Sequence, residues 1–242
     1  MYLLNLLRVA LYSVALVSSF HWKSFTLSNS HCRRSRVIRH LGKTSDGISA
    51  GIDLGTTNSA ICVLKEGVPS LVPIFGNRLL PSAVTYHRNG SVDVGEYSKL
   101  SRFLNPRNTF LSTKRVIGRK LSSLSEVKAD LTFLKVDKSS KDNENCVLKC
   151  DNVNATISPE DVASEVLRTL LSAAQEYCGE KISRAVIGVP AYFMPDQCEA
   201  TERAGFKAGL DKVIILKEPE AAALAYGVTT NESQIVMVNR IT

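Results

Sequence analysis

The chain has 242 residues, of which 44% are hydrophobic, so it is long enough for one domain or two small ones with a real core. Its net charge of +7 comes from the first 45 residues, which hold seven basic residues and no Asp or Glu. Subtracting these seven leaves 23 basic residues against 23 acidic ones, so the remainder is formally neutral. Binding of nucleic acid through bulk charge is therefore excluded, and we expect no nucleic-acid partner.

Residues 1–45 have the composition of a targeting leader. An apolar stretch from Val9 to Phe20 follows Arg8, and it is too short to span a bilayer comfortably but suits the hydrophobic region of a secretory signal. Residues 21–45 are rich in Ser, Arg, Lys and His and lack acid, which is typical of an organellar transit peptide. Together they predict a bipartite plastid leader; the alternatives are a mitochondrial presequence, the secretory pathway and an uncleaved anchor. Once the leader is removed, we expect no stable transmembrane helix.

The cysteines do not form a recognisable metal or disulfide framework. They contain no Cys-x-x-Cys pair, and the three His residues after position 21 do not complete a metal-binding set with them. We therefore expect mostly buried thiols in a reducing compartment. The six are Cys32, Cys62, Cys146, Cys150, Cys178 and Cys198.

Two short apolar runs, Gly51–Leu54 and Ala60–Leu64, flank a turn of glycine, hydroxyl and amide residues. This pattern predicts a β-hairpin with a polar tip. Gly55 lets backbone N–H groups approach an anion, and Asp53 offers a carboxylate to a hydrated divalent cation. The tip is therefore a candidate phosphate site, and the alternative is an ordinary hairpin turn.

Extended and helical patterns alternate through the middle of the chain. Extended runs at Pro69–Phe75 and Ala83–His87 predict further strands, so the early part of the domain is expected to be antiparallel. Helix-compatible patterns follow at Glu96–Leu104 and Thr109–Ile117, separated by a breaker that contains proline. The polar region Leu121–Asp151 is expected to form a small mobile sheet.

A regular alternation of helices and strands begins at Ser158, which is followed by proline and acid at the positions of a helix N-cap. A long amphipathic helix is expected from there to Cys178, with Gly179 as its stop. Parallel strands need helical crossovers, so we expect a mixed five-stranded sheet of the ribonuclease-H type with ligands at the strands' carboxyl ends. The expected elements are strands Ala185–Val189, Val213–Leu216 and Ile235–Val238 and helices Asp196–Ala208 and Pro219–Tyr226.

Four separated segments carry a pattern beyond secondary structure. They are Gly51–Ser59, Asn105-Pro106 with Lys114–Arg119, Val189–Phe193 and Glu218–Gly227. In order and spacing they resemble the ATPase domain of the heat shock protein 70 (DnaK-type) chaperones, which belong to the actin-like ATPase superfamily. The resemblance covers residues 49–238 and implies an α/β fold, an actin-like ATPase lobe with a small inserted subdomain.

The resemblance implies that residues 46–242 form the first lobe of a nucleotide-binding domain, with the small inserted subdomain at about 81–155. In the family, the strand at Ile235–Val238 runs into a glycine-rich second phosphate loop, whereas Asn239-Arg240-Ile241-Thr242 follows it here. We therefore expect the second lobe and the peptide-binding domain to be absent. ATP hydrolysis by this chain alone should be weak or missing, because phosphoryl transfer needs many groups positioned at once.

The resemblance also implies how the hairpin tip binds its ligand. The phosphates of ATP or ADP are expected to contact Gly55, Thr56, Thr57 and Asn58. Asp53 is expected near Mg²⁺, as both a catalytic and a metal-site residue. K⁺ is a further candidate ion of the same site.

Three residues outside the hairpin receive roles from the resemblance. Lys114 matches the catalytic lysine that places the attacking water, which suits a compact ammonium with three donors. Glu218, also expected as a catalytic residue, matches the acid that holds the metal through water, and Pro190 matches the proline that couples nucleotide state to a partner domain. The alternatives are a solvated lysine, a helix-capping acid and a plain strand terminator.

The function implied by the resemblance is an ATP-binding molecular chaperone that assists protein folding or import in an organelle. Its implied partners are a J-domain co-chaperone, a nucleotide exchange factor and unfolded polypeptides. One alternative is a sugar or small-molecule kinase of the same superfamily, which shares the Asp-x-Gly-Thr-Thr opening. The other is a non-enzymatic lobe kept only as an interaction surface.

Overall fold

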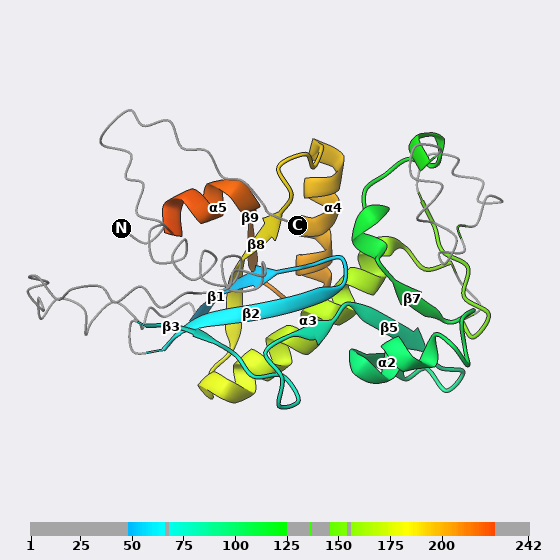
Figure 1. Cartoon of the computed structure of the whole chain (residues 1–242), viewed down its shortest axis with the longest axis horizontal. Helices are drawn as coiled ribbons and strands as arrows, with labels where there is room; N and C mark the ends of the chain where they lie inside the picture. The colour runs from blue at the N-terminus through cyan, green and yellow to red at the C-terminus, as the bar shows by residue number, and fades with distance from the viewer. Residues whose placement is uncertain (1–47, 66–67, 125–135, 137–145, 154–155, 226–242) are drawn as a thin grey trace, which may run out of the picture.

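The computed structural model describes residues 48–65, 68–124, 136, 146–153 and 156–225 (Figure 1). These residues form a six-stranded sheet and a separate three-stranded sheet. The strands are β1 (Ile48–Asp53), β2 (Asn58–Lys65), β3 (Val68–Leu71), β4 (Leu80–Pro81), β5 (Ala83–Tyr86), β6 (Val92–Val94), β7 (Thr109–Leu111), β8 (Ile182–Val189) and β9 (Lys212–Lys217). The helices are α2 (Glu96–Ser101), the 3₁₀ turn η2 (Thr113–Arg115), α3 (Pro159–Cys178), α4 (Pro195–Lys207) and α5 (Glu218–Ala225).

The larger sheet is mixed, as predicted. Five strands follow one another in the order β3-β2-β1-β8-β9, and the two-residue β4 pairs with β2 beside this path. The hairpin β1–β2 is antiparallel, whereas β8 pairs in parallel with both β1 and β9. The α/β class and the mixed sheet of an actin-like ATPase lobe are therefore confirmed.

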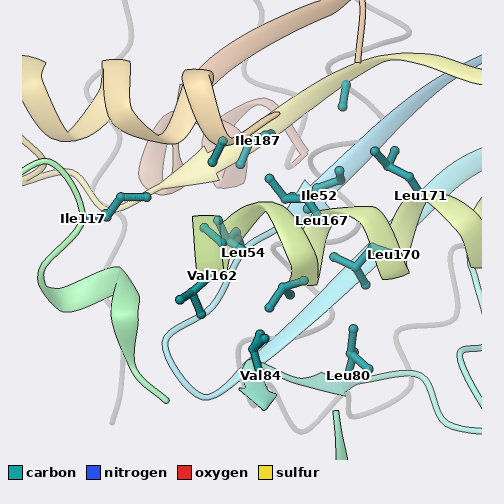
Figure 2. Packing of buried hydrophobic residues seen from close by; sticks show 14 of the residues in the cluster. Ile52, Leu54, Leu80, Val84, Ile117, Val162, Leu167, Leu170, Leu171 and Ile187 are labelled. Carbon is teal, nitrogen blue, oxygen red and sulfur yellow. The ribbon is translucent and has the colours of Figure 1, made fainter. Parts of the chain in front are cut away.

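The core follows the period-two alternation of the strands. Ile52 of β1 and Ile187 of β8 point to the same side of the sheet and are fully buried there. Helix α3 covers this side with Leu167, Leu170 and Leu171, as Figure 2 shows. Helix α4 packs beside α3 and against β9, while α5 lies on the opposite side of the sheet from α3 (Figure 1). One face of the large sheet therefore packs against α3 in the main core, and the other face lies against α5.

Helix α3 begins and ends where the sequence predicts. The hydroxyl of Ser158 accepts a hydrogen bond from the N–H of Asp161, and the Asp161 carboxylate accepts from the N–H of Ser158 at 2.9 Å. Gly179 ends the helix in the left-handed region, with φ of 70°. Both ends are therefore capped by local residues, and the helix packs along one face of the sheet.

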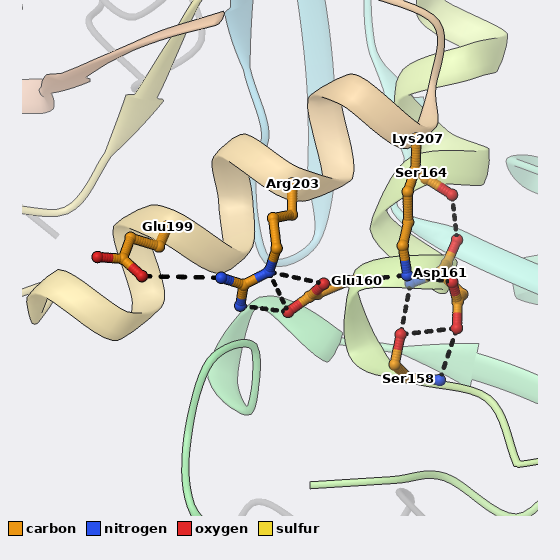
Figure 3. A network of polar contacts seen from close by, with 7 residues as sticks. All are labelled: Ser158, Glu160, Asp161, Ser164, Glu199, Arg203 and Lys207. Carbon is orange, nitrogen blue, oxygen red and sulfur yellow. Dashed lines mark hydrogen bonds and ion pairs between the residues drawn. The ribbon is translucent and has the colours of Figure 1, made fainter. Parts of the chain in front are cut away.

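Charged side chains join the start of α3 to α4 on the surface (Figure 3). Arg203 Nη2 donates to Glu160 Oε1 at 2.7 Å, and Lys207 Nζ donates to Asp161 Oδ1 at 2.7 Å. Single exposed pairs of this kind contribute little, but here two pairs share adjacent residues of one helix. This network links the start of α3 to α4 and lies outside the site described below.

Two predicted elements come out differently. The helix predicted at Thr109–Ile117 is wrong, because Thr109–Leu111 form β7 against β5 and only Thr113–Arg115 form a 3₁₀ turn. Phe110 is buried by this pairing, and Ser112 takes a left-handed φ of 59° that breaks a helix. Ala83–His87 does contain a strand, β5, but that strand is the centre of the three-stranded sheet.

Several predictions fall on residues that the structure does not describe. The leader, the strand at Ile235–Val238 and most of Leu121–Asp151 lie outside the described ranges. Within the described ranges, none of the helices has the length and apolarity that crossing a membrane requires. The three-stranded sheet falls within the range predicted for the inserted subdomain, whose bounds stay a prediction.

Candidate functional site

Three neighbouring parallel strands end at one edge of the large sheet. Asp53 is the last residue of β1, Pro190 directly follows β8, and Glu218 directly follows β9. Asp53 is paired with Gly188, and Gly188 is paired with Leu216, so the three strand ends are in register. The carboxyl ends of parallel strands are where open α/β sheets bind ligands. Three residues that are far apart in sequence are thus brought to one edge.

The hairpin tip follows directly from Asp53 and spans residues 54–57. A Cβ atom at Gly55 would lie 1.9 Å from the carbonyl oxygen of Asn58, so only glycine allows the chain to fold back this closely. Thr56 lines a cavity next to the sheet edge, whereas Thr57 is exposed to solvent. Asn58 begins β2 and pairs with Pro81. Of the four predicted phosphate-loop residues, Thr56 is the one that faces the cavity.

Lys114 lies on the 3₁₀ turn η2 and is held there by its neighbours in sequence. Val116 and Ile117 are buried in the main core. Gly118 has a φ of +63°, and a Cβ atom there would lie 2.5 Å from the carbonyl oxygen of Asp196. This segment therefore packs tightly against the start of α4, which fixes the backbone that carries Lys114.

Lys114 and Glu218 form an ion pair across the site. Lys114 Nζ donates to Glu218 Oε1 at 3.2 Å, although the residues are 104 positions apart. The two side chains are 9% and 24% exposed, so the pair is largely withdrawn from solvent. The ammonium also lies 5.7 Å from the ring centroid of Phe193, within the range of a cation–π contact. Two of the predicted catalytic residues are thus in direct contact.

A cavity of about 350 Å³ lies beside this pair. The described residues that line it include three basic side chains and no acidic one, which is the donor set of an anion site. Two buried nitrogen atoms of its lining residues, Arg119 Nε and Gln197 Nε2, have no hydrogen-bond partner among the described residues. The lining residues are Thr56, Lys114, Arg115, Arg119, Tyr192, Phe193 and Gln197.

The same edge offers carboxylates for a hydrated cation. Among the described residues, no group of three or more His, Cys, Asp and Glu residues is placed to hold a metal ion directly. Mg²⁺ usually keeps several waters and uses one or two carboxylates together with substrate phosphates. Asp53 and Glu218, at the ends of β1 and β9, fit that second mode of binding.

Pro190 begins a tight turn that carries the aromatic part of the site. Its carbonyl oxygen accepts a hydrogen bond from the N–H of Phe193 at 3.1 Å. Phe193 is buried beside Lys114, whereas Tyr192 is 73% exposed. The position of Pro190 therefore determines where the ring beneath the lysine lies.

Some residues of the site were not predicted from the sequence. Arg115, Arg119 and Gln197 line the cavity, and Phe193 contacts Lys114. Arg115, Arg119 and Phe193 lie within the four segments that resemble the family, so their closeness to Lys114 and Pro190 in sequence was an available signal. Gln197 had no such signal, because it enters the site only through the packing of α4.

Comparison with known proteins agrees with this arrangement. The profile of the family described as Hsp70 protein matches residues 49–241. The chain is similar to the chaperone protein dnaK of Cyanidium caldarium, with 43% identity over 78% of this chain and 30% of the relative. It is also similar to the stromal 70 kDa heat shock-related protein, chloroplastic, of Pisum sativum, with 39% identity over 78% of this chain and 26% of the relative.

A third relative gives the same result. Identity to the heat shock 70 kDa protein 6, chloroplastic, of Arabidopsis thaliana is 40%, over 78% of this chain and 26% of the relative. The chain thus spans less than a third of the length of these curated relatives. The family profile covers well over half of the chain and includes every predicted site residue. The chain therefore belongs to the Hsp70 family and covers part of that family's ATPase domain.

Proposed function

We propose that this chain binds the phosphate groups of ATP or ADP together with hydrated Mg²⁺, as one side of the ATPase site of an organellar Hsp70-type chaperone. The observation that carries this proposal is the Lys114–Glu218 contact beside a cationic cavity that Thr56 also lines. An anionic ligand suits that donor set, because the hydrogen bond from each donor is stronger in a site partly withdrawn from water.

The hairpin tip supplies donors to the phosphates. Backbone N–H groups of the loop and the hydroxyl of Thr56 would donate to anionic oxygens in the cavity, the exposed Thr57 hydroxyl would donate from the solvent side, and Gly55 keeps the loop narrow enough for close approach. Asn58 closes the loop at the start of β2. This set of short-range donors favours phosphate over a bulky apolar ligand.

Lys114 holds the reacting water in place. Its ammonium has three donors, of which one is taken by Glu218, leaving two for a water and a phosphate oxygen. The pairing with Glu218 and the ring of Phe193 restrict the lysine to one direction. Lys114 is therefore the residue whose loss should affect hydrolysis most.

Asp53 and Glu218 hold the metal through its water shell. When bound, Mg²⁺ supplies positive charge that stabilises the negative charge on the phosphates. Glu218 also pairs with Lys114, so its carboxylate would lie between the lysine ammonium and a bound hydrated Mg²⁺. We propose K⁺ as a further ion that binds at the same edge.

Pro190 is proposed to transmit the nucleotide state. It joins the end of β8 to the turn that carries Phe193, so a shift of Lys114 on ligand binding reaches Pro190 through that ring. The partners to which this signal would pass are a J-domain co-chaperone, a nucleotide exchange factor and unfolded polypeptides. The lobe is taken as residues 46–242, with an inserted subdomain at about 81–155.

We place the protein in a plastid, on the leader composition of residues 1–45 and the chloroplastic relatives. A fusion of these residues to a fluorescent protein should accumulate in plastids, and mitochondrial or secretory accumulation would contradict this location. The kinase and interaction-surface alternatives gain no support from any described feature, whereas the matching family is Hsp70 and similar proteins are named as chaperones.

Nucleotide binding is tested by calorimetry on the full chain with Mg²⁺ and ATP or ADP. Binding that is lost in Lys114→Ala and kept in Lys99→Ala supports the proposal, since Lys99 lies in an exposed pair with Glu96 on α2. Equal binding by both variants, or none by the unmodified chain, would overturn it. Because hydrolysis by this chain alone is expected to be weak or missing, the binding measurement is the deciding one.

A further inference from the structure

Ser82 lies where the chain leaves the large sheet and enters the small one. It separates β4, which pairs with β2, from β5, the central strand of the three-stranded sheet. Only 9% of the residue is exposed. The same residue contacts the hairpin tip, so it connects the second sheet with the proposed phosphate loop.

Ser82 makes three hydrogen bonds to the hairpin. Its N–H donates to the carbonyl oxygen of Thr57, and its hydroxyl donates to the carbonyl oxygen of Gly55, both at 2.8 Å. Its Oγ also lies 2.8 Å from Oγ of Ser59, which is fully buried. A hydroxyl has one hydrogen, and that of Ser82 is used on Gly55, so the hydroxyl of Ser59 donates to Ser82. The three groups form one directed chain that ends on the loop.

This chain determines the direction of one backbone donor. The described residues contain no cis peptide bond, so the C=O of Gly55 and the N–H of Thr56 point in opposite directions. Because the carbonyl is held toward Ser82, the N–H of Thr56 is directed away from it. Among the backbone hydrogen bonds of the described turns and loops, none is donated by this N–H, and Thr56 lines the cavity beside Lys114.

We propose that Ser82 is a positioning residue that fixes the Gly55–Thr56 peptide, so that the N–H of Thr56 is held ready for a phosphate oxygen. This inference rests on the proposed function and adds a residue that does not itself touch the ligand. A donor fixed in advance costs no reorganisation when the anion binds. Without the Ser82 hydroxyl, the Gly55 carbonyl and the Ser59 hydroxyl lose their shared partner and the peptide is free to rotate.

The test compares the full-length chain with Ser82→Ala and with the matched control Thr85→Val. Thr85 is a buried residue of β5 whose hydroxyl pairs with that of Thr109 at 3.0 Å, so the control also removes a buried hydroxyl pair, but in the second sheet. Two quantities are measured: the NMR order parameter of the Thr56 amide without ligand, and the calorimetric dissociation constant of inorganic pyrophosphate with Mg²⁺.

We expect an order parameter near 0.85 for Thr56 in the unmodified chain, falling toward about 0.6 in Ser82→Ala. Pyrophosphate binding should weaken about five- to tenfold in Ser82→Ala, the effect of one hydrogen bond, and stay unchanged in Thr85→Val. Ser82→Cys keeps the size but donates weakly, so it should give intermediate values, and it replaces the alanine variant if that does not fold.

An unchanged order parameter and affinity in Ser82→Ala overturn the proposal, as does an equal loss in Thr85→Val. If the unmodified chain does not bind pyrophosphate, the phosphate-binding function fails. The order parameter of Thr56 then decides the role of Ser82 by itself: a fall confined to the Ser82 variants supports positioning, and no fall refutes it.

Discussion

Gly55 illustrates how backbone geometry dictates a single residue of the site. The carbonyl oxygen of Asn58 occupies the place that a side chain at position 55 would need. The sequence indicates a glycine turn here, but turn preferences are weak and fit many loops. The folded hairpin supplies the specific reason, which is the close return of the chain at the start of β2.

Gly55→Ala should therefore weaken Mg²⁺–pyrophosphate binding by about tenfold or more, because the added Cβ must displace the loop. Gly76→Ala is the matched control: Gly76 has a positive φ of 80°, but no atom lies within 4 Å of its Cβ position. That control should lose about 1 kcal/mol of unfolding free energy and keep its affinity. Equal affinities in the two variants, measured by calorimetry, would contradict a phosphate-binding tip.

The Lys114–Glu218 pair is open to a direct energetic test. A double-mutant cycle with Lys114→Met and Glu218→Gln should give a coupling free energy of about 1–2 kcal/mol, because both side chains are largely buried. The exposed Lys99–Glu96 pair should give less than about 0.5 kcal/mol. Urea unfolding measures both cycles, and a coupling no larger than that of the exposed pair would show that the lysine is solvated and not held for catalysis.

The bounds of helix α3 are determined by its own local sequence. Its start at Ser158 and its stop at Gly179 follow from local caps, which depend on residues within a few positions of each other. The helix predicted at Thr109–Ile117 fails for the opposite reason. Thr109 and Phe110 are stabilised by pairing with β5, a strand more than twenty positions away. A local pattern cannot reveal that competing partner.

The α3 cap carries a pH-dependent contribution to stability. Burial of Asp161 alone would raise its pKa, but hydrogen bonds from Lys207 and Ser158 outweigh burial and hold the pKa below its ordinary value. A carboxyl with a lowered folded-state pKa stabilises the fold above its unfolded pKa, and this stabilisation is lost as the pH falls through the folded value.

Ser158→Ala should cost about 1 kcal/mol of unfolding free energy at neutral pH, the usual value of an N-cap. Asp161→Asn should also lower the free energy of unfolding at neutral pH. The difference in unfolding free energy between this variant and the unmodified chain should shrink below about pH 4, because the pKa of an aspartate in the unfolded chain is about 4. Urea unfolding at several pH values provides the measurement. A difference that grows on acidification would contradict the lowered pKa.

At the scale of the whole molecule, the thiols report on burial. All five described cysteines are free, and Cys62, Cys146 and Cys150 are buried, as the sequence predicts. Burial raises the pKa of Cys62 to about 12 and that of Cys146 to about 11. Such thiols stay protonated and are poor nucleophiles in the folded state.

Iodoacetamide, applied at a pH near the ordinary thiol pKa of about 8.5, should therefore modify the partly exposed Cys178 and Cys198 before Cys62 and Cys146. In urea all four should react at similar rates. Mass spectrometry of the peptides follows each site. Rapid modification of Cys62 in the folded chain would mean that the β2 strand is less protected than the structure indicates.

The amino-acid sequence alone was enough to predict the hairpin, the capped helix α3, the alternating strands and helices, and the family. Each of these depends on periodicity, on caps or on ordered motifs that survive without knowledge of contacts. It could not reveal that Lys114 meets Glu218, that Gln197 enters the cavity wall, or that Ser82 holds the loop. Those contacts join residues separated by tens of positions. Only the packing of α4, the pairing of β4 with β2 and the register of β1, β8 and β9 bring them together.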